Sequence, residues 1–96
     1  AAAQQRAVEI ATVTSHTRPD GTSCFTVLDD FNVTDEATGE NAAWGQVTPE
    51  EVVNDWMNSE GHRANILNPD AHKMGVGYYS DNSSEWGRQW IQIFTE

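Results

Sequence analysis

Two short strings in this 96-residue sequence hold the residue types that bind metals or transfer protons. SHTRPDG (15–21) contains His16, and SEGHRANILNP (59–69) contains His62, with Glu40 between them in the sequence. Two imidazoles and one carboxylate are a ligand set suited to Zn²⁺ with an open position, or to acid–base chemistry. Their separations are much longer than those of independent zinc motifs, so spacing alone identifies no site.

Two consecutive helices are predicted around the second string. The first begins after Thr48, because Thr48 can cap it, a proline follows at the first helical position, and Glu51 completes a capping box. Its apolar residues recur at helical spacing and are expected to face the core: Val52, Val53, Trp56 and Met57. Ser59 can cap the second helix, which runs to about Leu67 and places His62 on the same face as Ser59.

The remaining elements follow from local composition. Residues 1–13 are rich in helix formers but lack an N-cap, and Pro19-Asp20-Gly21 is a strong turn signal. Four further segments are expected: a short helix or extended piece (24–28), a short strand (40–44), and two strands (73–79 and 88–95) joined by a hairpin loop (80–84). This order predicts one compact α+β domain with a small antiparallel sheet and flanking helices.

Charge and cysteine content narrow the functional classes. Fifteen acidic residues against five basic ones give a net charge of −10, which argues against binding to nucleic acid or to anionic membrane surfaces. No apolar run is long enough for a transmembrane segment. Cys24 is the only cysteine, so no intrachain disulfide can form. It has no nearby CxxC partner and no plausible histidine–asparagine context, so a catalytic thiol is not expected.

Five strings in order resemble the bacterial branch of the CAP superfamily (cysteine-rich secretory, antigen-5 and pathogenesis-related proteins, or SCP-like domains). They are SHTRPDG (15–21), GENAAWG (39–45), TPEEVVNDWMNSEGHRANIL (48–67), GVG (75–77) and WIQIF (90–94). The resemblance implies an α-β-α sandwich and a secreted or cell-envelope location. It also implies that residues 1–96 are a single CAP domain without its usual first helix, which normally packs beside the helix at 1–13. Several hundred Å² of apolar surface would then lie open, so the fragment is expected to self-associate or to belong to a longer chain.

The resemblance also implies a polar cleft. CAP proteins carry two histidines and two glutamates there, which bind a divalent metal in some members. His16 and Glu40 match one residue of each pair, whereas Ser59 and Gln89 stand where the others are usual. His62 is expected to replace the missing imidazole, so that His16, Glu40 and His62 are the candidate catalytic residues and zinc ligands. Asn41, Arg63 and Asn65 are expected to fix the surrounding loops. Asp20 is a candidate partner for Arg63.

Three functions remain open. The wider family most often implies a binding module for a lipid, a small apolar ligand or a partner protein, and this interpretation ranks first. The second is a structural domain with no ligand. The third is a metal-assisted, peptidase-like hydrolase, because Ser59 lacks a nucleophile-elbow context and water would need a metal to activate it.

Overall fold

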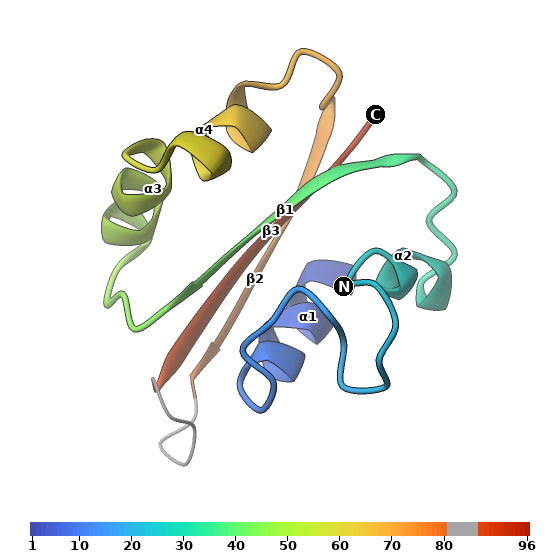
Figure 1. Ribbon diagram of the computed structural model, residues 1–96, viewed down its shortest axis with the longest axis horizontal. Coiled ribbons are helices and arrows are strands. Elements are labelled where there is room, and N and C mark those ends of the chain that lie inside the picture. Colours follow the sequence, from blue (N-terminus) through green and yellow to red (C-terminus); the bar gives the residue numbers. More distant parts are fainter. Residues whose placement is uncertain (81–86) are drawn as a thin grey trace.

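The computed structural model describes residues 1–80 and 87–96 and centres on a three-stranded antiparallel sheet (Figure 1). The strands are β1 (Ala37–Trp44), β2 (Lys73–Ser80) and β3 (Arg88–Thr95), in the order β1-β3-β2. The two C-terminal strands pair as predicted, although most of the expected hairpin loop lies outside the described residues. Helices cover both faces of the sheet, which confirms the α+β class and the α-β-α arrangement.

One face is covered by α1 (Ala2–Ile10), with the short α2 (Thr26–Asp30) beside it. Apolar side chains of both helices join Ile91 and Ile93 of β3 in the larger core cluster. The expected helix over 1–13 stops at Ile10, where Thr12 turns its hydroxyl onto the Glu9 carbonyl. β-Branched residues follow, and these favour leaving the helix. As expected, the Ala1 side chain does not cap α1.

Glycine allows α1 to lie directly on β2. A Cβ atom at Gly77 would collide with the backbone carbonyl group of Ala3. The absence of a side chain at this position therefore sets the distance between helix and sheet, which in turn places the inward-facing residues of α1.

The other face is covered by α3 (Pro49–Met57) and α4 (Glu60–Leu67). Thr48 caps α3 by accepting a hydrogen bond from the Glu51 amide, as predicted. Val52 and Trp56 are buried against β1 and β3, whereas Val53 is 43% exposed, so its expected place in the core is wrong. Val53 follows Val52 by one helical position, and the buried stripe of this short helix is too narrow to include both.

Three tryptophans connect helices and loops to the sheet through hydrogen bonds from their indole N–H groups. Trp44 donates from Nε1 to the Ile10 carbonyl, and Trp56 donates to the Ala42 carbonyl. Trp90, buried in β3, donates to the Gln46 carbonyl. These bonds give the three indole N–H groups acceptors while the rings pack against the sheet.

An apolar stripe on β2 remains open to solvent. Met74, Val76 and Tyr78 are 56%, 58% and 39% exposed. They alternate with Gly75 and Gly77, which face α1, so the stripe lies on the α3–α4 side of the sheet. The open surface was expected beside the helix at 1–13, whereas this stripe lies on the opposite face of the sheet, where α4 contacts β1. Within the described residues, no helix is both long and apolar enough to cross a membrane.

Candidate functional site

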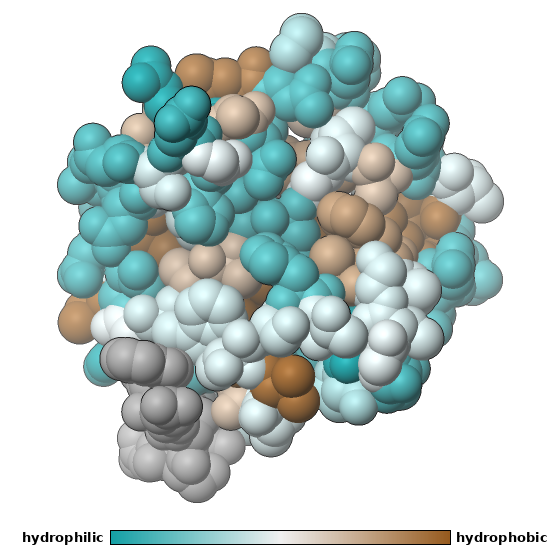
Figure 2. Space-filling model, viewed as in Figure 1, coloured by the Kyte–Doolittle hydropathy of each residue, from teal (hydrophilic) through white to brown (hydrophobic). Residues whose placement is uncertain are grey.

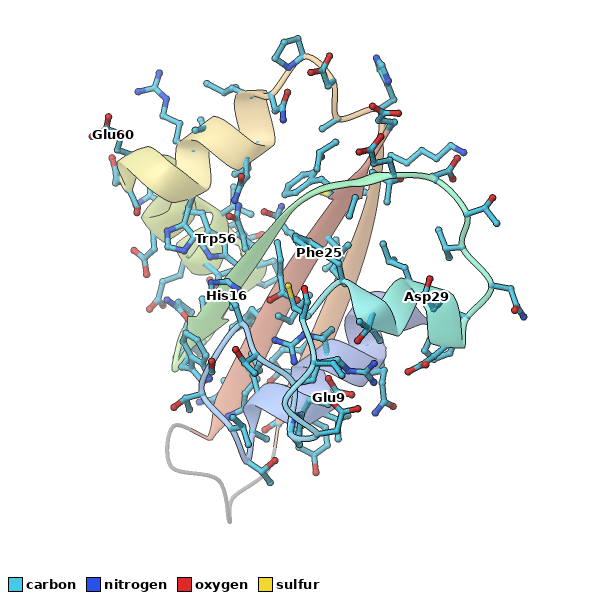
Figure 3. All side chains as sticks on the ribbon, turned by 45° about the vertical axis from the view of Figure 1, so that its right-hand side comes forward. Glu9, His16, Phe25, Asp29, Trp56 and Glu60 are labelled. Carbon is cyan, nitrogen blue, oxygen red and sulfur yellow. The ribbon has the colours of Figure 1, made fainter. Side chains whose placement is uncertain are left out.

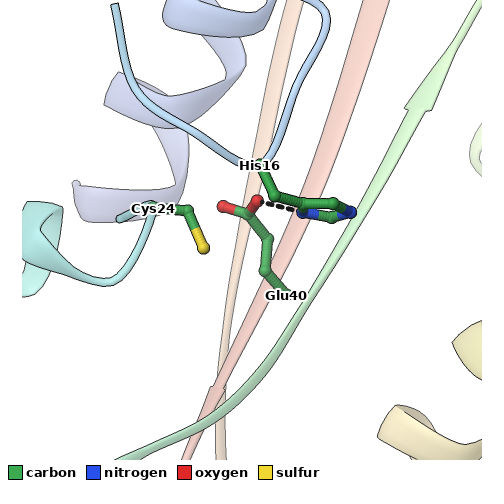
Figure 4. A group of neighbouring side chains, drawn as sticks. All are labelled: His16, Cys24 and Glu40. Atoms are coloured by element: carbon green, nitrogen blue, oxygen red, sulfur yellow. Dashed lines mark hydrogen bonds and ion pairs between the residues drawn. The ribbon is translucent and has the colours of Figure 1, made fainter. Parts of the chain in front are cut away.

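His16 and Glu40 meet beside β1, an outer strand of the sheet. His16 stands on the loop after α1 (Figure 3), and its Nδ1 atom lies 2.8 Å from Oε1 of Glu40 (Figure 4). On the α4 side of this strand, Nδ1 of His62 is hydrogen-bonded to Oγ of Ser59 at 2.8 Å. We call His16, Glu40, Ser59 and His62 the edge site. Hydrophilic side chains cover much of the face seen in Figure 2, with apolar patches between them.

A buried arginine forms hydrogen bonds with the Glu40 carboxylate. Arg6 of α1 donates from Nε to Oε2 of Glu40 at 2.8 Å and from Nη2 to Oε1 at 3.2 Å. The side chains of Arg6 and Glu40 are 0% and 1% exposed, whereas that of His16 is 57% exposed. Glu40 is therefore a buried support that orients an exposed imidazole, with its Nδ1 engaged and its Nε2 left to face outward.

The Arg6–Glu40 ion pair belongs to a larger network of charged side chains that extends away from the edge site. Arg6 Nη1 donates to Glu9 at 3.0 Å, and Arg18 donates to the same carboxylate at 2.7 Å. Arg18 also pairs with Asp30 at 2.9 Å. The sequence interpretation did not include Arg6 or Glu9, although their i,i+3 spacing was a signal, and Arg18 stands in the string SHTRPDG. Alternating charges thus link α1, the loop and α2 to β1.

These contacts shift the pKa values at the edge site. Burial alone would raise the pKa of Glu40, but hydrogen bonds from His16 and Arg6 outweigh it and lower that pKa. The neighbouring Cys24 side chain and then the Glu40 carboxylate raise the pKa of His16 to about 9. Burial, followed by the charge of His16, lowers the pKa of His62. Near pH 7 the site therefore presents one charged and one neutral imidazole.

Two amides hold α4 against β1. Asn41, fully buried, donates to the His62 carbonyl at 3.1 Å and accepts from Asn65 Nδ2 at 2.9 Å. Gly39 leaves the room that this contact needs, because a Cβ there would lie 2.7 Å from Oδ1 of Asn65. These bonds place His62 beside the same strand that carries Glu40.

Two other expected residues do not join this arrangement. Arg63 is exposed, and its guanidinium has no hydrogen-bond partner within residues 1–80 and 87–96. Its expected partner Asp20 bonds to Thr22 instead, so the geometry does not support a loop-fixing role for Arg63. Gln89 is fully buried in β3 opposite Trp44 and cannot contact a ligand at the edge site.

The expected zinc ligands do not converge as a set. In the described part of the chain, the group with ligand atoms all within 4.8 Å of one another is His16, Cys24 and Glu40, and it does not include His62 (Figure 4). The proximity of Cys24 to His16 was not predicted from the sequence. The chain turns at 18–21, and the Cys24 amide donates to the His16 carbonyl at 3.0 Å, which brings the two residues side by side.

The hollows described on the surface are lined by other residues. One of about 310 Å³ lies between the start of α1 and the ends of β2 and β3, where its apolar lining includes Ala3, Leu28 and Ile93. Another of about 500 Å³ lies along α3 and α4 beside Met57 and Leu67. The edge-site residues line neither of these two hollows.

Comparison with known proteins agrees with this fold. The family model of the cysteine-rich secretory protein family (CAP) matches residues 1–94. "Uncharacterized protein YkwD" of Bacillus subtilis is 50% identical over 76 residues, which are 79% of this chain and 29% of that protein. "Uncharacterized membrane protein YlbC" of the same organism is 41% identical over 59 residues, which are 57% of this chain and 17% of that protein. The chain thus spans less than a third of either relative.

Two solved structures are similar over 99% of this chain. One is an extracellular protein containing a SCP domain from Bacillus anthracis, with a TM-score of 0.83, 27% identity and 30% of its own chain covered. The other is an outer surface protein from Borrelia burgdorferi, with a TM-score of 0.76, 24% identity and 70% of its chain covered. The second likeness speaks for the fold alone.

Proposed function

This chain belongs to the CAP family, and on that premise we propose that it is a bacterial binding domain that acts outside the cell membrane, secreted or in the cell envelope. The extracellular description of the similar Bacillus anthracis protein supports this location. The excess of acidic side chains suits a soluble, solvated surface.

The observation that carries the proposal is the contrast in exposure within one hydrogen-bonded unit. Arg6 and Glu40 are buried, yet together they fix an imidazole that is 57% exposed. Burying an ion pair is costly, and a purely structural pair would not need an exposed third member. A fixed Nε2–H on His16 is suited to donating a hydrogen bond to an acceptor on a binding partner.

The shape of the site favours a partner protein. Enclosed pockets bury most of a small molecule, whereas the side chain of His16 is 57% exposed. The net charge of −10 opposes contact with anionic lipid surfaces. A lipid or a small apolar ligand is therefore the alternative occupant.

The geometry gives less support to a hydrolase. Both oxygens of Glu40 already accept hydrogen bonds, and its carboxylate is buried, which opposes its use as a general base. Ser59 and His62 form a hydroxyl–imidazole pair, but none of the described carboxylates hydrogen-bonds to His62 to complete a triad. We therefore assign Ser59 and His62 to the contact surface of the edge site.

Photo-crosslinking can test this function on the secreted domain. A photoreactive amino acid is introduced at Thr17, which is exposed and adjacent to His16, and separately at Glu50, which is exposed on α3. We expect crosslinking to an envelope or secreted protein from position 17 and not from position 50. His16→Gln is expected to abolish the product, and His72→Gln, on a residue elsewhere on the surface, to leave it unchanged.

Each other outcome has a definite meaning. Label that moves into the organic phase on extraction would identify a lipid as the occupant. Equal products from positions 17 and 50, or a product that persists in His16→Gln, would overturn the assignment of the edge site.

A further inference from the structure

We propose that His16, Cys24 and Glu40 bind a thiophilic divalent cation, with Zn²⁺ as the reference ion. A ring nitrogen, a sulfur and a carboxylate oxygen converge there, with all ligand atoms within 4.8 Å of one another (Figure 4). Cys24 and Glu40 are buried, and His16 closes the group on the solvent side. The inference does not rest on the proposed binding function.

The present spacing is close to that of a tetrahedral zinc site. Zn–N, Zn–O and Zn–S bonds of about 2.0–2.3 Å place neighbouring ligand atoms roughly 3.3–3.8 Å apart. His16 Nδ1 and Glu40 Oε1 are now 2.8 Å apart, and no ligand pair exceeds 4.8 Å. A movement of about 1 Å at the side-chain tips is therefore enough to accommodate the ion. The exposed ring of His16 is the member freest to make it.

Neighbouring groups orient the Glu40 carboxylate and balance the charge of the metal site. Carboxylates that bind metals are usually held by further hydrogen bonds, and Arg6 supplies two of these to Glu40. The cation would take the place of the proton between His16 and Glu40 and of the thiol proton of Cys24. Arg6 remains balanced by Glu9, so the buried network is not left with an unpaired positive charge.

The donor set indicates which ions fit. A thiolate with an imidazole suits zinc and related transition metals, whereas Ca²⁺ and Mg²⁺ prefer six or more oxygen ligands. Cys24 thus takes the place that the sequence interpretation had given to His62. His62 Nδ1 is instead directed to Ser59.

Cobalt titration provides a direct test, because thiolate ligation to Co²⁺ produces a charge-transfer band in the near ultraviolet. Cys24 is the only cysteine of the chain, so any such band reports on this residue alone. Titrating the reduced 96-residue chain is expected to give a band that saturates at one Co²⁺ per chain and is removed by added Zn²⁺. Cys24→Ser is expected to abolish the band.

Three histidine variants locate the other ligands and avoid any doubt about folding, since all three rings are at least partly exposed. His16→Gln is expected to weaken Co²⁺ binding by more than about tenfold, whereas His62→Gln and His72→Gln leave it unchanged. Absence of the band in the folded wild-type chain would overturn the proposal. So would a Co²⁺ affinity that His16→Gln leaves unchanged, or a band that His62→Gln abolishes.

Discussion

Arg6 and Glu40 form a buried, two-point hydrogen-bonded pair between α1 and β1, at 2.8 and 3.2 Å. The pair fixes the carboxylate that orients His16. The same guanidinium also bonds to Glu9 and to the Ser15 carbonyl, so a single side chain joins the helix, the loop and the sheet. The position of the edge site therefore depends on Arg6, although Arg6 is itself buried.

The first prediction concerns this arginine. Arg6→Gln leaves Glu9 and Glu40 buried without their shared cation, and breaking a buried pair in this way typically costs about 3–5 kcal/mol. We expect a loss of this size in the free energy of unfolding, measured by urea denaturation. Arg63→Gln is the matched control, because its exposed side chain should change stability by less than about 0.5 kcal/mol. Equal losses in both variants would contradict the account.

The second prediction is an acid-dependent loss of stability. Burial raises the pKa of Glu9, but hydrogen bonds from Arg18 and Arg6 outweigh burial and hold it below the ordinary 4.5. A carboxyl whose pKa is lower in the folded state stabilises the fold above pH 4.5 and loses this contribution as the pH falls through the folded value. The urea midpoint should therefore drop below pH 4.5. Glu9→Gln should flatten this dependence, whereas Glu36→Gln, on an exposed residue, should leave it intact.

The third prediction compares two glycines. Gly77→Ala drives a methyl group into the Ala3 carbonyl, and overpacking of this kind costs about 1–3 kcal/mol. Gly61→Ala adds a methyl group on α4 with nothing within 4 Å, and it should raise stability by up to about 1 kcal/mol. Thermal denaturation of both variants measures the difference. A Gly77→Ala protein as stable as the wild type would show that α1 does not lie this close to β2.

The fourth prediction concerns the open stripe on β2. Met74, Val76 and Tyr78 present apolar side chains on an edge strand, and such edges tend to associate. The 96-residue chain is expected to self-associate through this stripe as its concentration rises, as measured by light scattering. Val76→Glu should keep it monomeric, and Val47→Glu, on an exposed loop residue, should not. A wild-type chain that stays monomeric at high concentration would refute this.

Local sequence signals predicted the elements that depend on local interactions. The cap at Thr48 and the alternating strands at the C-terminus are examples. β1 is longer than expected, because Ala37 and Gly39 have little intrinsic strand preference. Their extended conformation depends on pairing with β3, which no local pattern reveals.

The site could be predicted only in part for a similar reason. The resemblance pointed to His16 and Glu40, but the contacts of Arg6 and Cys24 depend on the path of the loop. Residues 17 and 23 form an antiparallel bridge around the turn, which sets Cys24 opposite His16. Pro19-Asp20-Gly21 marks the turn of this loop in the sequence. Pairing the residues on either side of that turn would have predicted the hairpin-like loop.

Histidine NMR tests the central claim, that a buried ion pair fixes His16 as the exposed polar contact of the edge site. The ring nitrogens of the three histidines are followed in the metal-free chain as the pH is raised. The pKa of His16 is expected to be about 9, and that of His62 to lie below 6.5. Because the pKa of His16 is raised in the folded state, its stabilising contribution is full below pH 6.5 and is lost through about pH 9. A His16 that titrates near 6.5, unchanged by Glu40→Gln, would contradict the account.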